Sequence, residues 1–119
     1  MAIKALNPFA PYWYVPKDEQ TSSEELKTRF RLRGLDGEQL GHVGPEFILD
    51  EFGRVKNITG RGIEIALSFG VTDWENFNND QGAVKFSRAN FRMIPYDIRS
   101  ELAVEIISAS SPSEDERKN

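Results

Sequence analysis

The stretch from Lys27 to Arg33 alternates strictly between cations and uncharged residues, and it constrains the fold more than any other part of the chain. Successive side chains of a β-strand point to opposite faces, so Thr28, Phe30 and Leu32 share one face. The other face then carries the four cations Lys27, Arg29, Arg31 and Arg33. Such a half-buried strand needs neighbouring strands and a core against its apolar face, so the chain is predicted to contain a sheet with one covered side.

The composition fits one folded domain and excludes many enzyme templates. Of the 119 residues, 39% are hydrophobic and 29% are charged, as in an ordinary globular domain. The chain has no cysteine and one histidine, which excludes cysteine nucleophiles, disulfides and thiolate metal sites. The net charge of −4 argues against nucleic-acid binding, because clustered cations dominate affinity for phosphate backbones. We therefore expect a protein that is not an enzyme and that uses no cofactor.

The sequence also favours a cytoplasmic protein without a membrane partner. Asn7 and Pro8 interrupt the N-terminus before the apolar core of a signal peptide can form. The longest purely apolar run is about four residues, whereas a transmembrane helix needs roughly 20.

Local patterns predict short strands in the N-terminal half. Prolines and aromatic residues indicate an extended arm over residues 1–11 and a strand over residues 12–15 that pairs at a sheet edge. Residues 17–25 are polar and are predicted to be an exposed loop. Asp36 can cap a short helix. Residues 46–58 fit a hairpin turning at Gly53, although the first half of this stretch could equally be helical.

The C-terminal half is predicted to be mainly helical. Thr59 is a good N-cap for a helix over residues 60–69. The expected elements that follow are a turn-rich loop at 73–82 anchored by Trp74 and Phe77, a short extended piece at 83–86, a short helix at 88–94 stopped by Pro95, and a helix at 96–108. The apolar stripe of this last helix consists of Ile98, Leu102, Ala103, Ile106 and Ile107.

Together these elements predict the fold class and the domain limits. We expect a small α+β domain over residues 1–108, with short antiparallel strands in the N-terminal half and a helical C-terminal half. Residues 109–119 are predicted to form a disordered polar tail.

Three consecutive aromatic residues give the first candidate interface. Tyr12, Trp13 and Tyr14 cannot all face the core if they lie on a strand, so at least one ring should lie outside the domain's own packing. An exposed aromatic side chain can anchor a protein interface, and it can equally pack along the sheet edge of its own domain.

The basic face of the alternating strand gives the second candidate interface. Arg29, Arg31 and Arg33 could form a solvated outer face, paired across strands with carboxylates such as Asp50 or Glu51. They could also dock an acidic partner or another copy of the chain.

Two other patterns resemble chemical sites only superficially. His42 lies in a glycine-rich turn without a nucleophile motif nearby, so a structural histidine is the better interpretation. The alternation of Asn76, Asn78 and Asp80 is similar to a calcium loop, but the glycine and the twelfth-position glutamate of that loop are misplaced. No metal site is predicted.

Five short motifs, taken in order, give the chain a resemblance to a known group of proteins. They are YVP at residues 14–16, FRLRGLDGEQL at 30–40, DWENF with DQGAVKFS at 73–87, MIPYDIRSELAVEI at 93–106, and SPSEDERKN at 111–119. In this order the chain resembles the small tail assembly chaperone-like proteins of long-tailed bacteriophages and prophages.

The resemblance implies a role in assembly rather than catalysis. Proteins of this group engage the tape measure protein and tail-tube subunits, are absent from the finished particle, and can form homo-oligomers. The resemblance carries no catalytic residue, and the matching apolar positions, such as Phe30, Trp74 and Leu102, are expected to define the fold. The alternative expectation is a structural virion component, such as a tail-tube, tail-completion or head–tail joining subunit.

Overall fold

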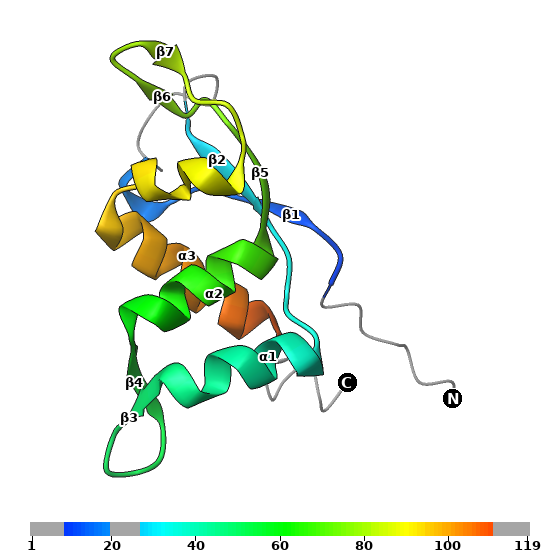
Figure 1. Ribbon diagram of the computed structural model, residues 1–119, viewed down its shortest axis with the longest axis vertical. Coiled ribbons are helices and arrows are strands. Elements are labelled where there is room, and N and C mark those ends of the chain that lie inside the picture. Colours follow the sequence, from blue (N-terminus) through cyan, green and yellow to red (C-terminus); the bar gives the residue numbers. More distant parts are fainter. Residues whose placement is uncertain (1–8, 20–26, 111–119) are drawn as a thin grey trace.

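The computed structural model describes residues 9–19 and 27–110 of the chain. Its strands lie mostly in the N-terminal half and its long helices in the C-terminal half, so the predicted α+β class is confirmed (Figure 1). The predictions for residues 1–8, for most of the loop at 17–25 and for residues 111–119 fall outside the described residues. The last helix continues to Ser110, past the domain limit predicted at residue 108.

The alternating stretch is the central strand of a three-stranded antiparallel sheet. Strand β2 (Arg29–Leu32) lies between β1 (Tyr12–Tyr14) and β5 (Val71–Glu75). Phe30 and Leu32 are fully buried, which confirms the predicted apolar face, and β1 lies at an edge as expected. A short 3-10 helix, η1 (Lys17–Glu19), follows β1.

Strand β5 corrects the loop predicted at 73–82. The asparagine and aspartate residues there are local turn signals, but Val71 and Trp74 are buried against the core and draw the backbone into the sheet beside β2. The turn signals act later in the chain, between β6 (Asn78–Asn79) and β7 (Gly82–Ala83). The predicted anchoring of this region by Trp74 is confirmed, since its indole N–H donates to the Val84 carbonyl at 2.7 Å.

The stretch that could have been helical is a hairpin. Strands β3 (Phe47–Leu49) and β4 (Val55–Ile58) pair in antiparallel register. The Asp50 carboxylate closes the turn, because Oδ1 accepts from the backbone N–H groups of Phe52 and Arg54 at 2.8 and 2.9 Å. Gly53 takes a φ of +78°, which favours glycine there.

Two of the three predicted helix N-caps, Asp36 and Thr59, are confirmed, whereas the predicted cap at Ser87 is not. Asp36 caps α1 (Gly37–Val43) with a reciprocal bond to Gln39. Thr59 caps α2 (Gly60–Gly70) by accepting from the Gly62 N–H at 3.1 Å. A 3-10 helix, η3 (Gly44–Glu46), follows α1.

The C-terminal half contains η4 (Arg88–Met93) and α3 (Tyr96–Ser110). The short helix predicted at 88–94 is therefore 3-10 rather than α-helical. Ser87 occupies its N-cap position, but the hydroxyl makes no capping hydrogen bond within the described chain.

The core lies where α2 and α3 cover the apolar face of the sheet (Figure 1). Leu102, Ala103 and Ile106 of α3 are fully buried, which confirms most of the predicted stripe. An aromatic cluster extends the core around Trp74, whose ring centre lies within 6.2 Å of the rings of Phe30, Phe77, Phe86 and Phe91.

A glycine at the end of α2 packs directly against α3. A Cβ atom at Gly70 would lie 2.6 Å from atoms of the buried Ile106 side chain. Any side chain at position 70 would overlap with Ile106, so this contact between the two helices requires glycine.

We predict that Gly70→Ala destabilises the domain by about 1–3 kcal/mol, because the added methyl group must push Ile106 out of a packed site. Chemical denaturation measures the loss. Gly60→Ala is the matched control on the same helix, since its Cβ meets nothing within 4 Å, and it should change stability by less than about 1 kcal/mol. Equal effects of the two substitutions would contradict the close-packing explanation.

Candidate protein-interaction surfaces

The outer face of the sheet brings together two of the predicted interface residues. Trp13 of β1 lies directly opposite Arg31 of β2, and Arg31 lies opposite Asp73 of β5. The Trp13 ring is 44% exposed, as expected for a side chain that alternates away from the core. These three residues form a row across the sheet, which we call the outer sheet face.

The remaining arginines of the basic stretch have different surroundings. Arg29 lies opposite Glu75, and their side chains form an ion pair at 3.6 Å. Arg33 lies beyond the end of β2, where its Nε donates to the Phe69 carbonyl at 3.0 Å. Among the described residues, the carboxylates opposite Arg29 and Arg31 come from β5. The prediction of Asp50 as a partner is wrong, because Asp50 pairs with Arg54 within the β3–β4 hairpin.

Tyr12 and Tyr14 point to the other side of the sheet and connect β1 to α3. The Tyr12 hydroxyl donates to Glu105 Oε1 at 2.9 Å, and the Tyr14 hydroxyl donates to Glu101 Oε2. The backbone N–H of Lys17 donates to the same Glu101 oxygen at 3.0 Å. The two glutamates are four positions apart, about one helical turn, so their carboxylates lie on one side of α3 and hold the strand along the helix.

These contacts shift the titration of both tyrosines. Burial raises the pKa of Tyr12 well above its ordinary value, and the hydrogen bond to the negative Glu105 raises it further. Burial and the bond to Glu101 act on the pKa of Tyr14 in the same direction. Both hydroxyls are therefore donors across the physiological pH range.

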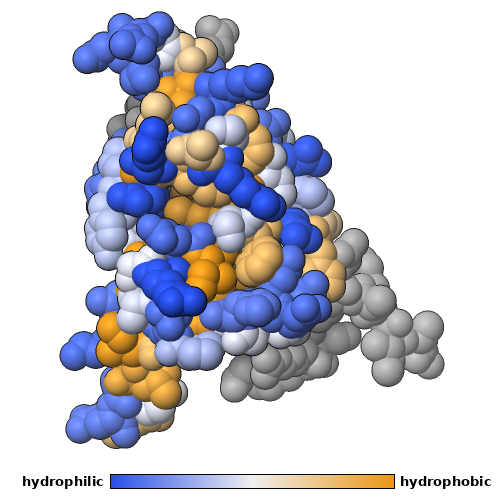
Figure 2. Space-filling model, viewed as in Figure 1, coloured by the Kyte–Doolittle hydropathy of each residue, from blue (hydrophilic) through white to orange (hydrophobic). Residues whose placement is uncertain are grey.

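A second surface was not recognised in the sequence. Among the described residues, large apolar side chains with high exposure gather on the β3–β4 hairpin, where Ile48, Leu49, Phe52 and Val55 are 45–72% exposed. Figure 2 shows hydrophobic colour at the end of the molecule that Figure 1 assigns to β3 and β4. The Arg54 guanidinium lies 5.0 Å from the centre of the Phe52 ring and covers part of it.

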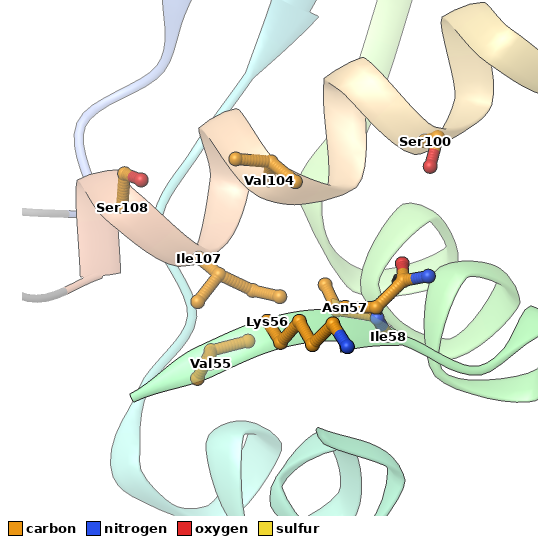
Figure 3. A pocket seen from close by; sticks show the side chains of 8 residues that line it. All are labelled: Val55, Lys56, Asn57, Ile58, Ser100, Val104, Ile107 and Ser108. Carbon is orange, nitrogen blue, oxygen red and sulfur yellow. Dashed lines mark hydrogen bonds between the residues drawn. The ribbon is translucent and has the colours of Figure 1, made fainter. Parts of the chain in front are cut away.

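A groove of about 320 Å³ continues this surface between β4 and α3 (Figure 3). All four consecutive residues of β4 line it, so the edge of the strand faces the groove. From α3 it is lined by Ser100, Val104, Ile107 and Ser108, which share one side of the helix. Val104, on the α3 side of the groove, is 55% exposed.

Leu49 and Val55 are cross-strand neighbours, so their side chains share one face of the hairpin. Val55 also lines the groove, which joins the hairpin face to the helix. We call this continuous region the hairpin–α3 surface, and it consists of Leu49, Val55, Ile58, Val104 and Ile107. The apolar run FIL was visible in the sequence, but only the packing of the hairpin at the end of the domain leaves it uncovered.

The residues considered as possible catalytic or metal-binding groups do not form a site among the described residues. His42 is exposed near the end of α1, with its ring centre 6.1 Å from that of Phe69. Within residues 9–19 and 27–110, no three histidine, cysteine, aspartate or glutamate side chains gather as a metal ion would require. In the same residues no helix combines the length and the apolar character needed to span a bilayer.

Comparison of this chain with protein-family models, with curated proteins and with solved structures finds no match.

We predict that stability falls as the pH rises above about 10, the unfolded pKa of tyrosine. Folding raises the pKa of Tyr12 and Tyr14, so the unfolded chain loses these protons first. Their contribution is complete below the unfolded pKa and is lost as the pH approaches the folded pKa. Urea unfolding at neutral and alkaline pH measures the fall, which should be shallower in the double variant Tyr12→Phe/Tyr14→Phe. An unchanged slope would show that these hydroxyls do not cause it.

Proposed function

We propose that this chain is a non-enzymatic, tail assembly chaperone-like protein of a bacteriophage or prophage. It binds other tail proteins, the tape measure and tail-tube subunits, during assembly in the host cytoplasm. The hairpin–α3 surface is the observation that supports binding to protein. The class of partner, other tail proteins, is inferred from the resemblance of the sequence motifs to tail assembly chaperone-like proteins.

The hairpin–α3 surface has the physical character of a binding site. Exposed apolar patches of a few hundred Å² commonly mark interaction sites on soluble domains. A partner that covers Leu49 and Val55 would add packing to a hairpin that has only two strands. Binding would remove these side chains from water, together with Val104 of α3.

The charges of the β3–β4 hairpin cancel. Asp50 and Arg54 form an ion pair at 3.2 Å, and the other two charged side chains of the hairpin, Glu51 and Lys56, have opposite signs. Affinity should therefore come from apolar burial and depend little on salt. A tape measure protein is expected to be long and helical, and the apolar stripe of an amphipathic helix fits a groove lined by Val55, Val104 and Ile107.

We predict that Val104→Glu weakens binding to the tape measure or tail-tube protein at least about tenfold, because it places a charge in the apolar contact. Val104 is outside the core, so the fold should remain intact. Co-expression with each tail protein encoded beside this chain, followed by affinity capture and titration, measures the effect. Met93→Glu is the matched control, since Met93 is 44% exposed and lies outside the surface.

The outer sheet face is the competing contact surface. If it carries the interface, Arg31→Glu should abolish partner binding or change the oligomeric state, and binding should weaken with added salt. Unchanged binding and oligomeric state in Arg31→Glu would remove this face from the interface. Unchanged binding in both Arg31→Glu and Val104→Glu would contradict a role for either surface.

Mass spectrometry of purified particles separates the chaperone from a structural virion component. A chaperone is absent from mature virions although it is abundant in infected or induced cells. Detection of this chain in stoichiometric amounts in the particles would contradict the chaperone proposal and favour the structural alternative.

A further inference from the structure

A second pocket, on another side of α3, gathers three arginines. It has a volume of about 260 Å³ and lies between α2, η4 and α3. Arg88 and Arg92 come from η4 and Arg99 from α3, while Glu64 of α2 supplies one carboxylate. Figure 2 looks onto α2 and η4, where strongly hydrophilic side chains surround a partly hydrophobic hollow.

The arginines of this pocket lack anionic partners in the described chain. Within residues 9–19 and 27–110, none of Arg88, Arg92 and Arg99 forms an ion pair or a side-chain hydrogen bond. By contrast, Arg29, Arg33 and Arg54 are each bound to a carboxylate or a carbonyl group. The pocket therefore carries three cations and one anion in a protein whose net charge is −4.

Arg99 is held in place although one of its donors is unused. Its Nε atom is buried and has no hydrogen-bond partner among the described residues. The guanidinium lies 5.5 Å from the centre of the Tyr96 ring, one helical turn away on α3. Because Nε is buried, the terminal NH groups of this guanidinium are the donors that a ligand in the pocket can reach.

We propose that this pocket binds a carboxylate-bearing, acidic segment of a partner protein. Guanidinium groups bind carboxylates through paired hydrogen bonds in a planar geometry, and three of them can hold more than one carboxylate. Leu67 and Phe91 also line the pocket and offer contact to the aliphatic part of a glutamate or to a neighbouring apolar side chain.

The same charges favour a carboxylate over a phosphate or a nucleic acid. Glu64 places a negative charge in the pocket, which repels a dianionic phosphate more than a monoanionic carboxylate. The net charge of the chain opposes a polyanion that would extend beyond the pocket.

The test uses the full-length protein and a fluorescein-labelled oligoglutamate peptide in a fluorescence anisotropy titration. We expect binding at low salt that is lost at high salt. Arg92→Gln and Arg99→Gln should each weaken it at least about fivefold, because each removes a charge-assisted contact. Glu64→Gln should tighten binding about two- to fivefold by removing the opposing charge.

Arg61→Gln is the matched control, because Arg61 is an exposed arginine of α2 outside the pocket and the substitution changes the net charge equally. It should alter affinity less than about twofold. Arg92 is exposed, so Arg92→Gln tests the pocket even if Arg99→Gln lowers stability. Equal weakening by Arg61→Gln, or no weakening by Arg92→Gln, would overturn the proposal.

Two competitors distinguish the class of anion. Inorganic phosphate and an oligothymidylate are titrated against the bound peptide, and the proposal requires that neither displaces it as well as unlabelled oligoglutamate does. Stronger displacement by either would assign the pocket to phosphate instead. The pocket shares no lining residue with the β4–α3 groove, so the outcome is independent of the effect of Val104→Glu on tail-protein binding.

Discussion

The contact between Gly70 and Ile106 fixes the arrangement on which the other features depend. Gly70 is the last residue of α2, and β5 begins at the next residue. The contact of Gly70 with Ile106 of α3 therefore also sets how close α3 lies to the sheet. The Gly70 carbonyl accepts from the Arg33 N–H at 2.9 Å, which ties the end of β2 to the same point. One residue without a side chain thus joins helix, helix and sheet.

Because α3 is fixed in this way, its different sides can serve different contacts. Its buried side fills the core, and Glu101 and Glu105 hold the edge strand β1 through two tyrosine hydroxyls. Val104 faces the groove beside β4, while Arg99 faces the pocket beneath η4. The proposed contacts with tail proteins and with an acidic segment therefore share one helix and use separate residues.

Two features that depend only on neighbouring residues in the sequence, the N-caps of α1 and α2, were predicted correctly. Asp36 and Thr59 cap their helices because capping needs only a side-chain oxygen and the next few N–H groups. The prediction of a loop at 73–82 was wrong for residues 73–75, which belong to β5. Turn-forming residues outnumber apolar ones in this stretch, so the local pattern indicated a loop. Burial of Trp74 against other rings, supplied from distant parts of the chain, decided in favour of a strand.

The sequence by itself determined the alternating strand, the caps of α1 and α2, the apolar stripe of α3 and the lack of cysteine, since each follows from local spacing or composition. Only the tertiary structure decided which charges meet. It placed Glu75 and Asp73 opposite the arginines of β2, left the β3–β4 hairpin uncovered, and gathered Arg88, Arg92 and Arg99 around one pocket. The reason is physical: pairing between strands and helices far apart in the chain is set by packing, which local spacing does not encode.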